Sequence, residues 1–198
     1  MVSIIDSSKS KELKSDVVKD LKQVDDIIKS NFDSKINLVN ELSLHIFEGG
    51  GKRIRPLILL TSARATGYVG ANHISLAAVL ELIHTATLLH DDVVDDSEMR
   101  RGKIAARMLW GNEASVLVGD YLLGEAFKMM VEAQSIKALE VLSNAATVIA
   151  EGEVMQLVYS NHLTIKPEMY FQIINYKTAK LFSAASEIGA IISESGTK

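Results

Sequence analysis

ELIHTATLLHDDVVDDSEMRRGK, residues 81–103, is the most informative stretch of the chain. It begins with apolar residues at helical spacing, continues with four aspartates in six positions and closes on two adjacent arginines. At about 100° per residue, His84, Asp91 and Asp95 lie within roughly 40° of one another on one helix face. Two carboxylates one turn apart are costly to bury unless a cation neutralises them. Magnesium is the natural partner, because it binds one or two carboxylates together with water and substrate phosphate.

The rest of the chain is dominated by apolar residues at helical spacing. Hydrophobic residues make up 47% of the 198 positions and proline occupies two, which indicates a globular, mostly helical protein with one substantial core. We expect an all-α bundle with its site between facing helices, a single domain over residues 1–198, and no strand. The periodicity predicts seven helices, at about residues 9–30, 35–47, 57–66, 73–96, 115–130, 136–159 and 170–192.

Composition and charge exclude several classes of protein. The chain has no cysteine, which rules out disulfides and thiolate metal sites and suits a reducing cytoplasm. A net charge of −4 without a basic block gives no reason to expect nucleic-acid binding. Residues 1–16 lack the pattern of a secretory signal, and the longest apolar run, residues 74–89, is interrupted by Glu81 and His84. We therefore expect a cytoplasmic protein without a transmembrane segment.

A second polar motif, GGGKRIRP at residues 49–56, lies upstream. One interpretation is structural, with a helix ending in favourable cations, a glycine breaker and a turn. The other is a polyanion site, because Lys52, Arg53 and Arg55 beside exposed glycine N–H groups offer the charge-assisted donors that a diphosphate binds. The residues alone leave both interpretations open.

Four motifs in the order GGGKRIRP, HDDVVDDSEMRRGK, EGEVMQL and YKTAKLF give the chain its resemblance to a known family. It is similar to the trans-isoprenyl diphosphate synthases, and most closely to their long-chain branch, the octaprenyl or polyprenyl diphosphate synthases. The resemblance implies an isoprenoid-synthase-type helical bundle around a central cavity. It also implies a transferase that joins isopentenyl diphosphate to an allylic prenyl diphosphate, with Mg²⁺ as cofactor.

The resemblance also assigns roles to single residues. Taken alone, His84 is typical of a core histidine and Lys177 of a solvent-facing charge, and the aspartates of a solvated helix end that the helix dipole disfavours. The family pattern implies magnesium binding by Asp91 and Asp95, with Asp92 in support. It implies contacts with isopentenyl diphosphate from Lys52, Arg55, His84 and Arg101. It implies contacts with the allylic diphosphate from Arg100, Lys177 and Thr178, and a cavity-facing side chain at Gln156.

The implied chemistry is the departure of diphosphate from the allylic substrate, attack by the double bond of isopentenyl diphosphate, and loss of a proton. Asp91 and Asp95 through the metal, with Arg100 and Lys177, would stabilise the departing diphosphate. Thr87 and Ala86 stand at the family's length-setting positions, and their small size favours a long all-trans product of the octaprenyl type. Thr87 lies roughly 40° from Asp91 on the helix, whereas Ala86 lies about 140° away, so the role of Ala86 rests on the resemblance.

A second aspartate-rich motif, which the family carries after the KT segment, does not occur after Asp120, and residues 193–198 resemble an interrupted end. We therefore expect the N-terminal portion of a polyprenyl synthase domain, with a bundle incomplete at its C-terminus. Three hypotheses remain: part of an octaprenyl-type synthase, a shortened noncatalytic subunit that pairs with a complete synthase, and a terpene cyclase-type enzyme. The motif GGGKRIRP argues against the last, because a cyclase needs no second diphosphate.

Partners follow from the same resemblance. The substrates are isopentenyl diphosphate and an allylic prenyl diphosphate, and a homodimer is expected from the family and from the amphipathic helices. Membrane contact, if it occurs, is peripheral and comes through the lipid product. A quinone side chain is one use that such a product serves.

Overall fold

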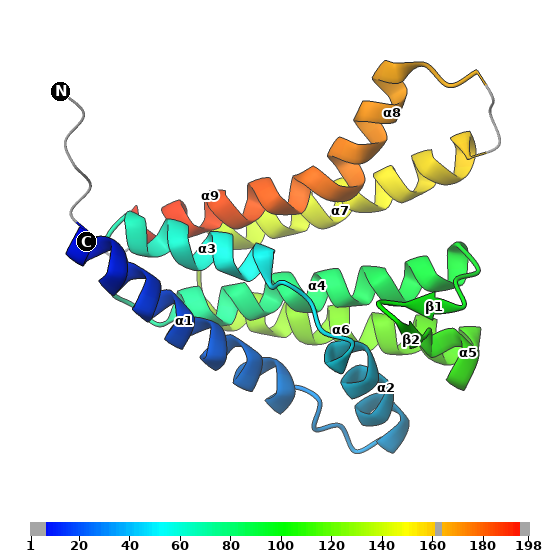
Figure 1. Cartoon of the computed structure of the whole chain (residues 1–198), viewed down its shortest axis with the longest axis horizontal. Coiled ribbons are helices and arrows are strands. Elements are labelled where there is room, and N and C mark those ends of the chain that lie inside the picture. Colours follow the sequence, from blue (N-terminus) through cyan, green and yellow to red (C-terminus); the bar gives the residue numbers. More distant parts are fainter. Residues whose placement is uncertain (1–6, 161–163, 195–198) are drawn as a thin grey trace.

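The computed structural model describes residues 7–160 and 164–194, and it is a helical bundle with one small hairpin (Figure 1). The remarks above on residues 1–6 and 195–198 fall outside the described residues. In chain order the elements are α1 Ser7–Ser30, α2 Asn37–Glu48, α3 Ile54–Ala65, α4 Asn72–Val94, β1 Met99–Arg100, β2 Lys103–Ile104, α5 Ala106–Trp110, α6 Asn112–Glu132, α7 Ile136–Tyr159, α8 Pro167–Ile174, the π-helix η1 Asn175–Ala179 and α9 Lys180–Glu194.

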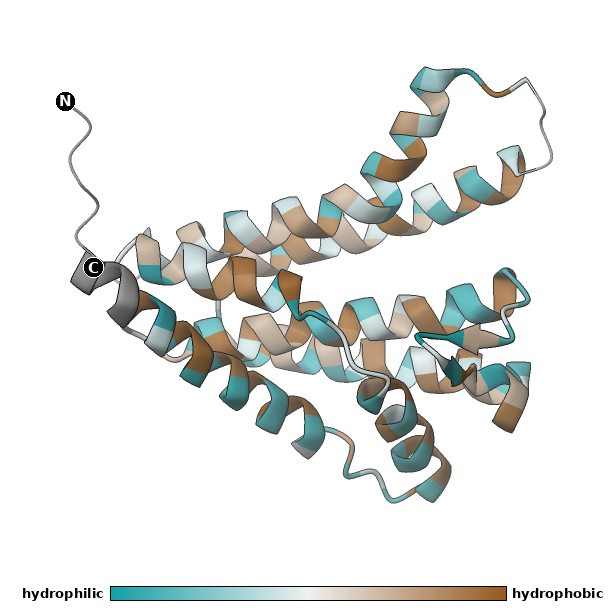
Figure 2. Ribbon diagram, in the orientation of Figure 1, coloured by the Kyte–Doolittle hydropathy of each residue, from teal (hydrophilic) through white to brown (hydrophobic). Residues whose placement is uncertain are grey.

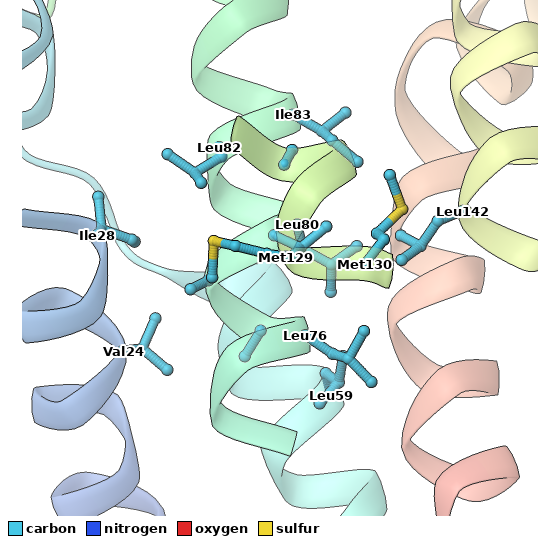
Figure 3. Close-up of a cluster of buried hydrophobic side chains, with 14 of the residues drawn as sticks. Val24, Ile28, Leu59, Leu76, Leu80, Leu82, Ile83, Met129, Met130 and Leu142 are labelled. Carbon is cyan, nitrogen blue, oxygen red and sulfur yellow. The ribbon is translucent and has the colours of Figure 1, made fainter. Parts of the chain in front are cut away.

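Helix α4 is the centre of the molecule. It packs against α6, α3 and α1, and most of its residues between positions 73 and 89 are buried. Figure 3 shows the core around it, where Leu80 of α4 lies beside Met129 and Met130 of α6. A helix that is apolar on nearly all sides is stable only when other helices surround it. The informative stretch therefore begins in the core and ends at its edge.

The length and apolar composition of α4 also resemble those of a membrane-spanning helix. Among the described helices, only α4 is long and apolar enough to cross a membrane, and 72% of its most apolar window is buried inside the bundle. This pattern is typical of a core helix.

α4 and the helices beside it form two layers. In Figure 1, α3, α7 and α9 lie in one layer while α4 and α6 lie in the other, and the contacts of α3 with α9, α7 with α9 and α4 with α6 agree. Figure 2 shows hydrophilic and hydrophobic residues alternating along α1, as expected for an amphipathic helix that covers the bundle. The expected all-α architecture is therefore present, with its helices close to the predicted ranges.

A buried cluster attaches α1 to the bundle. Asp20 is 3% exposed and accepts two hydrogen bonds, each of 2.9 Å, from Nε and Nη2 of Arg64 in α3. Nε2 of His73 at the start of α4 lies 3.1 Å from Oδ2 of the same carboxylate. A buried carboxylate requires such partners, so this cluster joins three helices away from any cavity described below.

Two local features differ from the prediction. The prediction of no strand is wrong, because β1 and β2 form an antiparallel hairpin in which Met99 pairs with Ile104. Arg101 and Gly102 both have positive φ, of 52° and 79°, which is the turn geometry that suits a two-residue hairpin. The predicted helix over residues 170–192 is also not continuous, because five residues of π-helix separate α8 from α9. The sequence shows neither feature, since an arginine at positive φ is uncommon and π-turns lack a sequence signal.

Gly189 allows α3 and α9 to pack closely, and we expect its replacement by alanine to destabilise the protein. A Cβ at this position would lie 2.6 Å from the backbone oxygen of Leu59 and 2.9 Å from the backbone nitrogen of Ala63. Overpacking of this kind costs about 1–3 kcal/mol, which should lower the Tm by several degrees.

Gly124 in α6 is the matched control, because a Cβ there would meet nothing within 4 Å. Gly124→Ala should raise the stability by about 0.5–1 kcal/mol through the better helix propensity of alanine. Thermal unfolding followed by circular dichroism measures both variants. A rise in Tm for Gly189→Ala of the same size as for Gly124→Ala would show that the close approach is absent.

Candidate active site

The aspartates at the end of α4 do not face the same way. Asp91 lies at the edge of a cavity, with its side chain 14% exposed, and Asp95 is exposed at the position that ends the helix. Asp92 is 1% exposed and points away from them into the protein. This separation follows from helix geometry. The side chains of neighbouring residues point about 100° apart around the helix axis, whereas those of residues four apart point about 40° apart.

Asp91 lies beside a lysine from a distant segment. Nζ of Lys177, in η1, lies 3.5 Å from Oδ2 of Asp91 and donates a hydrogen bond of 2.6 Å to Oε2 of Glu153 in α7. Burial raises the pKa of Asp91, with Lys177 opposing the rise, and burial likewise raises the pKa of Glu153 against the effect of the same lysine. Burial would lower the pKa of Lys177, but the hydrogen bond to Glu153 and the charge of Asp91 outweigh it and raise that pKa.

The donors at this edge suit a hard cation that is shared with a phosphate group. Asp91 and Asp95 offer carboxylate oxygens one turn apart, which is the donor type and number that Mg²⁺ accepts when phosphate and water complete its shell. Among residues 7–160 and 164–194, no group of three or more histidine, cysteine, aspartate or glutamate side chains is arranged to hold a metal. The residues therefore fit a magnesium–diphosphate complex better than a site made of protein ligands alone.

Asp92 holds an arginine of the hairpin. Its Oδ1 accepts a hydrogen bond of 2.7 Å from Nε of Arg100, and Nη2 of the same guanidinium group lies 2.5 Å from this oxygen as an ion pair. Its Oδ2 is buried and has no hydrogen-bond partner within the described part of the chain. Asp92 therefore orients Arg100, and its support of metal binding stays a prediction.

A basic pocket of about 500 Å³ lies between the loop after α2 and helix α4. Its lining contains all four residues that the sequence assigns to isopentenyl diphosphate, together with one carboxylate and one aromatic ring. The lining residues used below are Lys52, Arg53, Arg55, Glu81, His84, Arg101 and Phe182.

Arg55 is held in this pocket by packing and not by a carboxylate. The centre of its guanidinium group lies 4.5 Å from the ring centroid of Phe182 in α9, which is within range of a cation–π interaction. Its Nε is buried without a hydrogen-bond partner among the described residues. Burial lowers the pKa of Arg55, with Glu81 opposing this effect. Such a donor has unused capacity for an anion.

Gly51 of the GGGKRIRP motif lies next to a second arginine of the pocket, Arg101. A Cβ on Gly51 would lie 2.6 Å from Nη1 of Arg101, so any other residue here would displace that guanidinium group from its present position. Gly51 therefore brings the loop after α2 against the hairpin turn, which joins two motifs that are 50 residues apart in the sequence.

His84 is neutral in this pocket. Burial lowers its pKa to about 3, and the charges of Arg55 and Arg101 add to the effect. A neutral imidazole can donate a hydrogen bond from one ring nitrogen and accept one at the other. The pocket therefore combines permanent cations with a group whose charge depends on what binds beside it.

Arg53 is not free to bind an anion, although the sequence predicts that Lys52, Arg53 and Arg55 all do so. Its Nη1 donates to Oε1 of Glu81 at 2.6 Å and its Nε to Oδ1 of Asp25 at 3.1 Å. Its guanidinium group also lies 4.2 Å from the ring centroid of Phe47. Arg53 is thus occupied by residues of α1, α2 and α4.

A mostly apolar cavity of about 260 Å³ extends from Asp91 along α4. Thr87 lines it, as the helical spacing predicts, together with Ile83, Leu123 and Ile149. Ala86 is fully buried and is not among the lining residues, in agreement with its angle of about 140° from Asp91. Its role in setting product length is a prediction that this geometry does not support directly.

Gln156, Lys177 and Thr178 line a further hollow of about 440 Å³ next to the site.

The sequence patterns did not indicate a role for Gly152, one turn before Gln156. A Cβ at Gly152 would lie 2.7 Å from the backbone nitrogen of Lys177, so this glycine lets α7 and η1 meet and places Glu153 beside the lysine. A glycine between two glutamates in an otherwise apolar helix is the signal that could have indicated it.

Comparison with known proteins agrees with this geometry. The profile of the family described as Polyprenyl synthetase matches residues 36–198. The chain is 51% identical to octaprenyl diphosphate synthase of Escherichia coli (strain K12) over 173 residues, 87% of this chain and 54% of the relative. It is 42% identical to an all-trans-nonaprenyl-diphosphate synthase of Rhodobacter capsulatus, specific for geranyl diphosphate, with 89% of this chain and 54% of that protein covered.

The fold matches as well. A polyprenyl synthase from Caulobacter crescentus CB15, whose crystal structure contains calcium and isoprenyl diphosphate, superposes with a TM-score of 0.90 at 47% identity, covering 93% of this chain and 56% of the other. The chain spans about half the length of the curated relatives that it matches. The predicted isoprenoid-synthase-type all-α fold is therefore confirmed, and the chain belongs to the polyprenyl synthetase family.

Proposed function

We propose that this chain provides the substrate sites of a trans-prenyltransferase that condenses isopentenyl diphosphate with an allylic prenyl diphosphate. One observation carries the proposal. Two separate sites suited to a diphosphate flank α4, a basic pocket around Arg55 and a carboxylate–lysine site around Asp91, and an apolar cavity starts at the second. A condensation of two diphosphates needs this arrangement, because the two anions must be close together yet held apart.

Isopentenyl diphosphate is assigned to the basic pocket. Lys52, Arg55 and Arg101 supply charge-assisted hydrogen bonds, and His84 adds a group that can become positive beside the anion. Among the described residues that line the pocket, Glu81 is the one carboxylate, and Arg53 already binds it. This substrate keeps its diphosphate throughout the reaction, so binding by protein cations alone is sufficient.

The allylic diphosphate is assigned to the site around Asp91. Mg²⁺ held by Asp91 and Asp95 would supply the positive charge that the departing diphosphate needs. Lys177, Thr178 and Arg100 are the protein's own donors for this group, and Gln156 lines the neighbouring hollow. Arg100 is oriented by Asp92, so the acidic motif acts in two ways, through a cation on one face and through an arginine on the other.

The growing chain is assigned to the cavity below Asp91. Apolar walls exclude water, which protects an allylic cation until the double bond of isopentenyl diphosphate attacks it. The small side chain of Thr87 leaves the cavity open beyond the first units, which favours a long product. The octaprenyl and nonaprenyl relatives support a product of this class, and octaprenyl is the length that we propose.

Several wider properties belong to this proposal. We infer a cytoplasmic homodimer that meets membranes only peripherally through its product, and a quinone side chain as one use of that product. A terpene cyclase-type activity is less suitable, because the basic pocket would have no ligand. A noncatalytic subunit is also less suitable, because the sequence keeps Lys52, Arg55, Asp91, Asp95 and Arg100, which such a subunit would not need.

A product assay tests the proposed function. Incubation of the chain with farnesyl diphosphate, labelled isopentenyl diphosphate and Mg²⁺ should give longer prenyl products, and Asp91→Ala should reduce incorporation by at least about 100-fold, because charge stabilisation of the leaving group is lost. Incorporation by Asp91→Ala equal to that of the wild type would contradict the proposal. So would the absence of any product together with the absence of magnesium-dependent binding of farnesyl diphosphate.

Replacement of Thr87 by phenylalanine should shorten the product. The ring would fill the cavity one turn below Asp91, so elongation should stop after fewer units while the first condensation continues. Thr147→Phe is the matched control, because Thr147 is exposed on α7 and lines none of the cavities described here. Chromatography of the dephosphorylated products gives the length distribution. An unchanged distribution in Thr87→Phe would show that the growing prenyl chain lies outside this cavity.

The charge of His84 gives a prediction about pH. Its pKa of about 3 in the folded protein is below the usual 6.5, so the unfolded chain binds the proton more readily. The contribution of neutral His84 to stability is complete above about pH 6.5, and below it declines by up to about 1.4 kcal/mol per pH unit. Urea unfolding at pH 7 and pH 5 should show this loss, and His84→Gln should remove most of it.

His73, whose pKa burial also lowers, should contribute to any slope that remains in His84→Gln. Addition of isopentenyl diphosphate should raise the pKa of His84, because the anion stabilises the imidazolium ion, and the ring proton signals in NMR follow this change directly. A midpoint near 6.5 for His84 in the free protein, or no shift on addition of ligand, would argue against the assigned pocket.

A further inference from the structure

The basic pocket contains a carboxylate that should interfere with anion binding. Glu81 is the one acidic residue among the described residues that line it, and its side chain is only 5% exposed. A buried carboxylate attracts any cation nearby and repels an incoming diphosphate. Arg55 is near enough for Glu81 to raise its pKa against the effect of burial. Something must therefore prevent Glu81 from capturing Arg55.

Arg53 occupies Glu81. Its hydrogen bond to Oε1 is 2.6 Å long, and its other contacts, with Asp25 and the ring of Phe47, hold the guanidinium group in place with 15% of the side chain exposed. Its backbone has a φ of 48° and a ψ of 36°, an unfavourable conformation for a residue with a side chain, at the position before α3. These contacts tie the GGGKRIRP loop, which joins α2 to α3 in Figure 1, to α1, α2 and α4.

The neighbouring cations are left without carboxylate partners. Within residues 7–160 and 164–194, no ion pair is formed by Lys52, Arg55 or Arg101. Arg55 rests on Phe182, and Arg101 lies against Gly51. One arginine of the motif is thus committed to the protein while the others keep unused donors.

We propose that Arg53 is a positioning residue that neutralises Glu81 and so keeps Arg55 and Arg101 available for the diphosphate of isopentenyl diphosphate. The inference rests on the proposed function of this pocket. It assigns Arg53 no contact with the substrate. The effect of losing Arg53 on anion binding should therefore depend on whether residue 81 still carries a charge. If Arg53 contacted the diphosphate itself, its loss would weaken binding whatever residue stands at position 81.

Binding of inorganic pyrophosphate, measured by calorimetry without metal, tests this dependence. Arg53→Met should weaken binding by about tenfold, because the freed Glu81 attracts Arg55 and repels the anion. In Arg53→Met/Glu81→Gln the competing charge is gone, so the Kd should return to within about threefold of that of Glu81→Gln alone. Isopentenyl diphosphate should give the same pattern.

Arg64→Met is the matched control, because it breaks an arginine–carboxylate pair between α3 and α1 that lies outside the pocket. It should alter the Tm but not the Kd for pyrophosphate. Should Arg53→Met fail to fold, Glu81→Gln alone is decisive: binding as tight as in the wild type or tighter supports the inference, and weaker binding overturns it.

Each other outcome also has a definite meaning. Equally weak binding in Arg53→Met and in the double variant would show that Arg53 contacts the anion or holds the loop independently of Glu81, which overturns the inference but leaves the pocket assigned. Unchanged binding in Arg53→Met would overturn it as well. A wild-type chain that binds neither pyrophosphate nor isopentenyl diphosphate would overturn both the proposed function of the pocket and the inference.

Discussion

The structure depends on how the buried carboxylates of one apolar helix, α4, are neutralised. α4 runs through the core, yet it bears Glu81, Asp92 and Asp91, whose side chains are 5%, 1% and 14% exposed. Ionised carboxylates at such positions destabilise a protein by several kcal/mol unless each meets a cation. Each one does, through Arg53, Arg100 and Lys177, and these cations come from three different segments: the loop before α3, the hairpin and η1. The pairs around α4 therefore bring three of the four motifs together, and the hydrogen bond from Lys177 to Glu153 adds the fourth.

These pairs also decide which cations remain for substrate. Arg53 and Arg100 are engaged by buried carboxylates, whereas Arg55 is held by an aromatic ring and Lys177 is shared between two acids. An anion that binds to Arg55 need not break a buried pair. The polar groups of the site thus include some that shape it, such as Arg53, and others that keep unused donors, such as Arg55, and family motifs written as strings of letters do not distinguish the two.

The helices could be predicted from the sequence because they follow from local periodicity, whereas the roles of the site residues come from the family resemblance and stay predictions. The wheel angles correctly separated Thr87, which lines the cavity, from Ala86, which does not. The hairpin at Arg101–Gly102 and the π-helix at Asn175–Ala179 could not be predicted, because neighbouring elements impose these backbone conformations. The partners of Arg53 and Asp92 were missed for a similar reason: a pair between residues 28 positions apart, such as Arg53 and Glu81, leaves no spacing signal. Gly51 and Gly152 lie where such distant segments touch.

The central claim is that the basic pocket around Arg55 and the site around Asp91 are two diphosphate sites along α4 that are occupied together. The most direct test is a calorimetric titration of isopentenyl diphosphate into the chain already saturated with Mg²⁺ and a non-reactive allylic diphosphate analogue. The account predicts that isopentenyl diphosphate binds to the loaded chain with one equivalent per chain and without displacing the analogue. Displacement of the analogue, or failure of isopentenyl diphosphate to bind until the analogue is removed, would show that both ligands compete for one site and would contradict the account.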